Sequence, residues 1–91
     1  MPLNKLANIG KVTASALTQA GIDTSDKLRA CGAKQAFLAI RRHSDPEACL
    51  RVLYGLEGAL RGIKDTALDA ATKEDLISFF RDVQRGQPEN E

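Results

Sequence analysis

The chain has 91 residues, of which 43% are hydrophobic and 27% are charged, and its net charge at neutral pH is +1. This length fits one small domain, and the composition is ordinary for a soluble globular protein. The start of the chain has no apolar signal region, and no apolar run approaches the roughly 20 residues of a membrane span. We therefore expect a cytoplasmic protein with no membrane partner.

The charge is distributed unevenly along the chain. Residues 1–44 carry seven basic and two acidic side chains, a net charge of +5, whereas residues 45–91 carry six basic and ten acidic side chains, a net charge of −4. This asymmetry is compatible with a nucleic-acid face in the first half, or with two solvated halves that attract each other. A charge of +5 over 44 residues is small for a dedicated DNA-binding protein, which favours the second interpretation.

The cysteines and the histidine argue against a metal site. Cys31 and Cys49 are too few for a disulfide scaffold or a zinc site, and His43 raises the number of ligands to three at most, at irregular spacing. We interpret each cysteine as a buried structural thiol. Isolated carboxylate pairs and nucleotide-binding glycine loops are absent as well, so we predict no catalysis, no cofactor and no small-molecule substrate.

Helical periodicity runs through the whole sequence, and the alternation typical of strands is absent. Leu3 and Leu6 indicate a short opening helix. The next helix is predicted over Lys11–Ala20, with Val12 and Leu17 facing inward.

Glycines divide the segment that follows. Gly21 fits the left-handed position at which a helix ends. The polar residues after it supply capping oxygens for a short helix over Ser25–Ala30, which Gly32 ends. A separate helix is predicted over Ala33–Arg42.

The longest helix is predicted over Pro46–Arg61. Asp45 supplies a capping carboxylate, and Pro46 occupies the first helical position, where its fixed φ is favourable. We interpret Gly62 as the residue that ends this helix.

Two glycines inside this helix need a physical reason, because each costs about 1 kcal/mol relative to alanine. Gly55, Gly58 and Ala59 form a smooth strip, the glycine strip, which another helix can approach closely. A protein partner or a backbone-bound ligand is the alternative occupant. Glu57 and Arg61 are four residues apart, so we expect a surface ion pair or, alternatively, a partner site beside Gly58.

The last helix is predicted over Ala70–Gln84, capped by Asp69 or by Thr72. Residues 86–91 are polar and predicted to form a disordered tail, so that one domain spans residues 1–85. The expected fold class is all-α, a compact bundle of five helices after a short lead-in.

The segment Leu6–Thr13 has the layout of a helix-hairpin-helix turn. Asn8 stands where the pattern has its first glycine and tolerates a positive φ, and Gly10 keeps the second glycine. In the functional interpretation, backbone N–H groups at this turn face an anion such as a DNA phosphate, while Lys11 adds charge and Thr13 a hydroxyl. In the alternative, the turn only packs two helices together inside the core.

A single hairpin is expected to bind DNA weakly and without sequence preference, because phosphate contacts carry no sequence information. A second functional class is a protein-interaction or self-association module with no nucleic-acid role, which the acidic second half and the glycine strip favour. The basic residues that extend the surface in the DNA-binding interpretation are Lys5, Lys34, Arg41 and Arg42.

Three blocks of sequence carry a family resemblance. They are Leu6–Lys11 with Ala20–Ile22, Leu28–Ala33 with Ala36–Leu38, and Cys49–Leu50 with Leu53–Gly62. The last block is the most specific, through its glycine-rich core Leu-Glu-Gly-Ala. With these blocks the chain resembles the C-terminal domain of the TfoX/Sxy family of bacterial competence regulators over about residues 3–83.

The resemblance implies a compact five-helix domain akin to helix-hairpin-helix and SAM-like folds. It also implies a non-enzymatic role around DNA uptake or the transcription of competence genes, with DNA, a transcription-related protein or a second copy as partner. Full-length members carry an additional N-terminal domain, whereas Met1 here lies directly before the first block. The chain is therefore expected to be a stand-alone family member or an excised domain.

Overall fold

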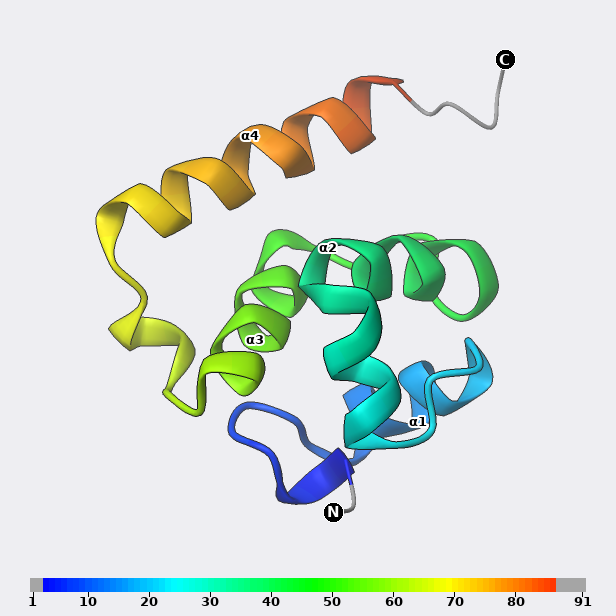
Figure 1. Cartoon of the computed structure of the whole chain (residues 1–91). Helices are drawn as coiled ribbons and strands as arrows, with labels where there is room; N and C mark the ends of the chain where they lie inside the picture. Colours follow the sequence, from blue (N-terminus) through cyan, green and yellow to red (C-terminus); the bar gives the residue numbers. More distant parts are fainter. Residues whose placement is uncertain (1–2, 87–91) are drawn as a thin grey trace.

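The computed structural model describes residues 3–86 and contains, over that range, four α-helices, two 3-10 helices and no strand. The α2 and α3 helices form the centre, with α1 and η1 packed on one side and α4 on the other (Figure 1). The predicted all-α class is confirmed for these residues. The elements are η1 (Leu3–Lys5), α1 (Lys11–Gln19), α2 (Ser25–His43), α3 (Leu50–Arg61), η2 (Asp65–Ala67) and α4 (Ala70–Gly86).

The helix count differs from the predicted five because α2 joins two of the predicted segments. Gly32 lies inside α2 with φ 83° and ψ 167°, so the helix kinks there without a connecting loop. Gly32 therefore has the non-helical backbone angles expected of a helix break, but the helical turns before and after it are continuous within α2. At the start of α2, the Thr24 hydroxyl accepts a hydrogen bond from the Lys27 N–H at 3.1 Å and supplies the expected cap.

The α3 helix begins four residues later than predicted, at Leu50. Asp45 forms a local turn instead of a cap: its Oδ1 accepts a hydrogen bond from the Glu47 N–H at 3.0 Å, and its backbone oxygen accepts one from the Ala48 N–H at 3.1 Å. Ala48 is buried, and its carbonyl accepts a hydrogen bond of 2.6 Å from Nη1 of Arg41. This tertiary contact holds the segment in a turn where proline and the carboxylate locally favour a helix.

Left-handed glycines end α1 and α3, as predicted. After α1, Gly21 has φ 89°, and the Ile22 N–H donates to the Leu17 carbonyl at 2.8 Å. After α3, Gly62 has φ 74°, and the Ile63 N–H reaches back to the carbonyl of Gly58 at 3.0 Å. This six-to-one hydrogen bond is the one that the Schellman motif uses to satisfy a free carbonyl at a helix end.

The core is aliphatic apart from one fully buried aromatic ring, Phe37. Val12 was predicted to face inward with Leu17, but it is 85% exposed. Helical residues are about 100° apart, which puts Val12 roughly 140° around the axis from Leu17, on the opposite face. The largest fully buried side chains are those of Phe37, Leu17, Leu28, Ile40, Leu53, Leu56 and Leu76.

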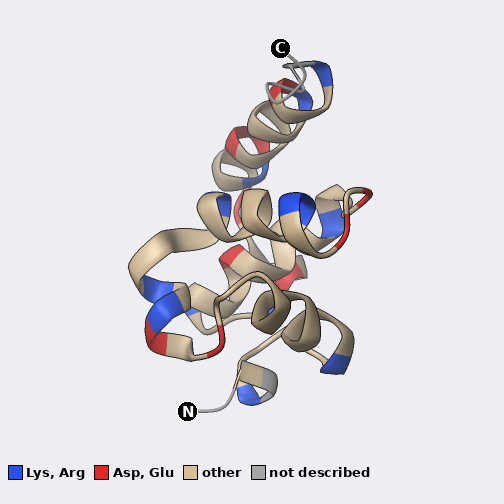
Figure 2. Cartoon of the chain, turned by 90° about the vertical axis from the view of Figure 1, so that its right-hand side faces the viewer, with Lys and Arg blue, Asp and Glu red and all other residues tan. Residues whose placement is uncertain are grey.

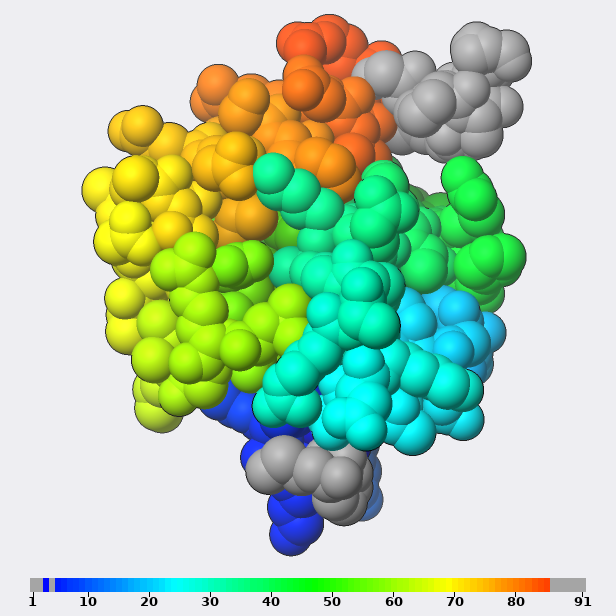
Figure 3. Space-filling view, in the orientation of Figure 1, coloured from blue at the N-terminus to red at the C-terminus, as the bar shows by residue number. Residues whose placement is uncertain are grey.

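The α4 helix lies along one edge of the molecule and packs on α3, and its side chains also contact α2 (Figure 3). Leu76 is buried, and the Phe80 ring meets Phe37 with the ring centroids 5.9 Å apart. Gly86 is the last residue of α4, and the rest of the predicted tail, residues 87–91, lies outside the described residues. Within residues 3–86, no helix has both the length and the apolar character needed to span a bilayer.

The two cysteines differ in their environments. Cys31 is half-buried, and its Sγ lies 3.6 Å from the Leu28 carbonyl oxygen; burial raises the pKa of its thiol. Cys49 is exposed just before α3, so the prediction of a buried thiol is wrong there. The later start of α3 is the reason, because Cys49 belongs to the preceding turn and not to the buried face of the helix.

Candidate functional site

The turn before α1 is anchored by the side chain of Asn8. Asn8 adopts the expected left-handed conformation, with φ 66°. Its Nδ2 donates to the carbonyl of Ile63 at 2.9 Å and to that of Gly55 at 3.4 Å, and its Oδ1 accepts from the Asp65 N–H at 3.0 Å. All of the partners lie in α3 or just after it. The Asn8 side chain therefore holds the turn in place and is directed into the fold.

The glycine strip receives this same turn. A Cβ atom added to Gly58 would lie 2.5 Å from Asn8 Nδ2 and 2.8 Å from the Ile63 oxygen, whereas one added to Gly55 would lie 3.5 Å from Asn8 Cβ. Gly55 and Gly58 are buried, and Ala59 is 3% exposed. The expected close approach is thus present, but the approaching element is the Asn8 turn and not another helix, and it covers the strip within the chain's own fold.

The first turn of α1 is open to solvent. Gly10 precedes the helix in an extended conformation, with φ −92°, and makes no side-chain capping hydrogen bond. Gly10, Lys11 and Val12 are exposed, and Thr13 is half-buried. A Cβ atom added to Gly10 would meet nothing within 4 Å. The backbone N–H groups of a helix start carry partial positive charge, so this end of α1, with the Lys11 ammonium group, attracts anions.

A shallow groove of about 380 Å³ runs beside this helix start, between α1 and the end of α2. It presents one cation, Lys11, and one anion, Asp45, with the exposed Val12 side chain at its wall. The lining residues are Lys11, Val12, Ser15, Ala16, Gln19, Ser44 and Asp45.

Two of the basic residues predicted to extend a DNA-binding surface are engaged elsewhere. Lys34 forms an ion pair of 2.8 Å with Asp75 of α4. Arg41 donates to the Ala48 carbonyl at 2.6 Å and to Gln84 Oε1 at 3.1 Å. Both side chains connect α2 to later parts of the chain, so the interpretation that the two charged halves attract each other describes Lys34 well.

Lys5 and Arg42 are exposed, but the basic residues do not form one patch. Figure 2 shows Lys and Arg at separate places around the fold, interleaved with Asp and Glu. Of the predicted anion site, the structure keeps Gly10, Lys11 and Thr13 together at the start of α1 and directs Asn8 away from it.

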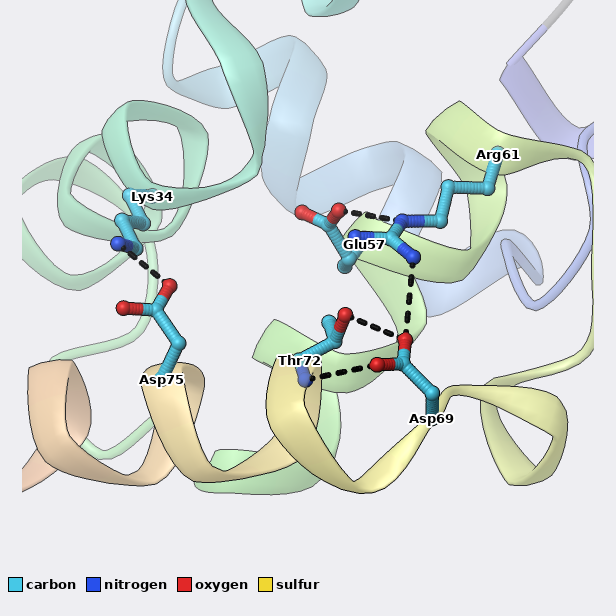
Figure 4. A network of polar contacts seen from close by, with 6 residues as sticks. All are labelled: Lys34, Glu57, Arg61, Asp69, Thr72 and Asp75. Carbon is cyan, nitrogen blue, oxygen red and sulfur yellow. Dashed lines mark hydrogen bonds and ion pairs between the residues drawn. The ribbon is translucent and has the colours of Figure 1, made fainter.

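Glu57 and Arg61 form the expected ion pair, with Nε and Oε2 2.7 Å apart. Arg61 also reaches Asp69 at 3.4 Å, just before α4. Asp69 in turn accepts hydrogen bonds from the Thr72 N–H at 3.3 Å and the Thr72 hydroxyl at 2.6 Å, as an N-cap does (Figure 4). The network therefore joins the end of α3 to the start of α4.

Acid should weaken this junction. The hydrogen bonds from Thr72, and then the charge of Arg61, lower the pKa of Asp69 below its ordinary value. A carboxylate with a lowered folded-state pKa stabilises the fold above its unfolded pKa of about 3.9 and loses that contribution as the pH falls through the folded value. In urea unfolding, the free energy of unfolding should fall less between pH 7 and about pH 3 for Asp69→Asn than for the unmodified chain. The asparagine side chain keeps the capping oxygen but does not titrate. An identical loss in both proteins would contradict this assignment.

Among residues 3–86, no three His, Cys, Asp or Glu side chains lie close enough together to hold a metal ion. Buried side-chain polar atoms in that range all have hydrogen-bond partners. The start of α1 therefore offers backbone N–H groups and one lysine, not a cluster of reactive side chains; α3 likewise begins without a side-chain cap, at Cys49.

Comparisons with known proteins place the chain in a family. The family model of the TfoX C-terminal domain matches residues 1–80. The chain belongs to the TfoX C-terminal domain family. Among curated proteins, none matches this TfoX C-terminal domain.

Two crystal structures of proteins from Listeria monocytogenes share the fold. An uncharacterized protein in a triclinic form is 42% identical, with a TM-score of 0.89 over 92% of this chain and 94% of that chain. A protein of unknown function in a tetragonal form is 43% identical, with a TM-score of 0.85 over 89% of this chain and 98% of that chain. This TfoX C-terminal domain is therefore similar to both over nearly its whole length.

Proposed function

We propose that this TfoX C-terminal domain is a non-enzymatic regulatory module, related to competence regulators, that contacts the DNA backbone through the first turn of α1. The observation that carries the proposal is the solvent-open helix start at Gly10, with Lys11 beside it and no side-chain cap. Backbone N–H groups at such a helix start bind phosphate oxygens without needing a particular base.

The rigidity of the preceding turn supports the proposal. Ile9 is 4% exposed, and the side chain of Asn8 makes hydrogen bonds to Ile63, Gly55 and Asp65. The N–H groups of the first turn of α1 are therefore held in position before a ligand arrives, which lowers the entropic cost of binding.

The binding is expected to be weak and independent of sequence. One hairpin presents few phosphate contacts, and Lys34 and Arg41 are engaged with α4. The logarithm of an affinity that comes from phosphate contacts falls linearly with the logarithm of the salt concentration, and the slope is proportional to the number of phosphates neutralised.

Lys11→Ala should lower the affinity for any duplex to a similar degree and reduce the slope of log affinity against log salt by about one. Fluorescence anisotropy with labelled duplex DNA, at low and near-physiological salt, measures both quantities. Arg81→Ala is the matched control, because it removes the same charge from an exposed site on α4, on the other side of α2. Equal slopes in Lys11→Ala and the unmodified chain would contradict a contact at Lys11.

A second candidate is self-association with no nucleic-acid role. Val12 is 85% exposed beside the groove, which presents Lys11 and Asp45 and so has charges that a second copy could complement across a two-fold axis. A mass by light scattering that rises with concentration in the unmodified chain, but not in Val12→Ser, supports this candidate. A constant monomer mass, or equal association of Val12→Ser, rejects it.

A further inference from the structure

Lys34 and Arg41, seven residues apart on α2, hold α4 in the same manner. Lys34 lies 2.8 Å from the carboxylate of Asp75 and 5.4 Å from the centre of the Phe79 ring. Like Lys34, Arg41 bonds a polar residue of α4 and lies near an aromatic ring of α4. We call Lys34 and Arg41 the cation clamp.

Arg41 completes the clamp at the other end of α4. Its Nη2 donates to Gln84 Oε1 at 3.1 Å, and its guanidinium carbon lies 6.0 Å from the centre of the Phe80 ring and 5.7 Å from that of Phe37. The same guanidinium also bonds the Ala48 carbonyl. Arg41 is thus bonded both to the turn before α3 and to α4.

The apolar contacts of α4 involve few residues. Within residues 3–86, α4 supplies one of the fifteen buried apolar residues, Leu76, and the other fourteen lie between residues 3 and 68. Phe79 and Phe80 are half-buried and pack against the core. Segments that bury few apolar groups and rely on exposed polar contacts open locally at lower free energy than the rest of a domain.

We propose that α4 is a latch that opens as a unit over α2 and α3 while residues 3–68 stay folded, and that the cation clamp keeps it closed. Salt screens the Lys34–Asp75 pair, whose side chains are 41% and 64% exposed, so higher ionic strength favours the open form. Opening uncovers the Phe37 ring together with the apolar face of α4.

Hydrogen exchange of the intact chain, followed residue by residue, tests the latch. Amides of α4 should exchange faster than those of α2 and α3, and faster again in about 0.5 M NaCl, because salt weakens exposed ion pairs. Lys34→Met should accelerate exchange in α4 about fivefold and leave the core of α2 and α3 unchanged. Asp75→Asn, which removes the other member of the ion pair, should act in the same direction.

Lys27→Met is the matched control. Lys27 forms an exposed pair with Asp23 at the same 2.8 Å distance, but Lys27 lies in the first turn of α2 and Asp23 just before the helix. Lys27→Met should leave the hydrogen exchange of α4 unchanged. Two results would overturn the latch: exchange of α4 at the same rate as the core of α2 and α3, or equal acceleration of α4 by Lys34→Met and Lys27→Met.

Discussion

Gly58→Ala should destabilise the domain by about 2 kcal/mol, although alanine is the better helix former. The added Cβ would lie 2.5 Å from Asn8 Nδ2 and 2.8 Å from the Ile63 carbonyl oxygen. These two atoms are hydrogen-bonded to each other at 2.9 Å, so neither can move away without loss of that contact. Urea unfolding, with similar m-values for both proteins, measures the difference in the free energy of unfolding.

Gly55→Ala is the control that separates packing from helix propensity. Both glycines are buried inside α3, but a Cβ at Gly55 would meet its nearest atoms, in Asn8, at 3.5 and 3.6 Å, which are ordinary contact distances. Gly55→Ala should therefore keep the propensity gain of up to about 1 kcal/mol. If Gly58→Ala were as stable as Gly55→Ala, the conclusion that the Asn8 turn leaves no room for a Cβ at Gly58 would be wrong.

Asn8→Ala should have the larger effect, a loss of about 3 kcal/mol. The substitution removes three side-chain hydrogen bonds, each of which stabilises the fold by about 1 kcal/mol net. It also places alanine in the left-handed region, where alanine lacks the polar side chain that makes Asn tolerable there, at a cost of about 1 kcal/mol more. Because the hydrogen bonds are partly exposed, the expected total is lower than the sum of these contributions. Thermal or urea unfolding checks this loss, which is a large part of the 5–15 kcal/mol typical of a domain.

Asn8→Gly distinguishes the two causes. Glycine accepts the φ of 66° without strain, so the loss of stability in Asn8→Gly should be about 1 kcal/mol smaller than in Asn8→Ala and should come mainly from the lost hydrogen bonds. In a Gly58→Ala background, Asn8→Gly should cost less than in the unmodified chain, because the clash has already disturbed the Asn8 contacts. Strictly additive losses would show that Asn8 and Gly58 do not act on each other.

Several parts of the fold were predictable because neighbouring residues determine them. Gly21, Gly32 and Gly62 all have positive φ, as expected of glycines at helix ends, and Asn8 has the left-handed conformation that its residue type tolerates. The Asp69 cap is likewise confirmed. In each case the preference comes from backbone sterics or from a hydrogen bond within a few residues, which the sequence alone displays.

Other features depend on residues far apart in the chain. The partners of the Asn8 side chain are 47, 55 and 57 residues away, which is why the turn that fills the glycine strip could not be foreseen. Arg41 and Lys34 face α4, and the Ala48 turn displaces the start of α3, for the same reason. Periodicity and capping patterns describe local preferences, whereas the choice of which charges pair and which glycines are covered is made when the helices pack. The sequence therefore established an all-helical fold and the glycines that end α1 and α3, and packing determined that Lys11, but not Lys34 or Arg41, is left beside an open helix start.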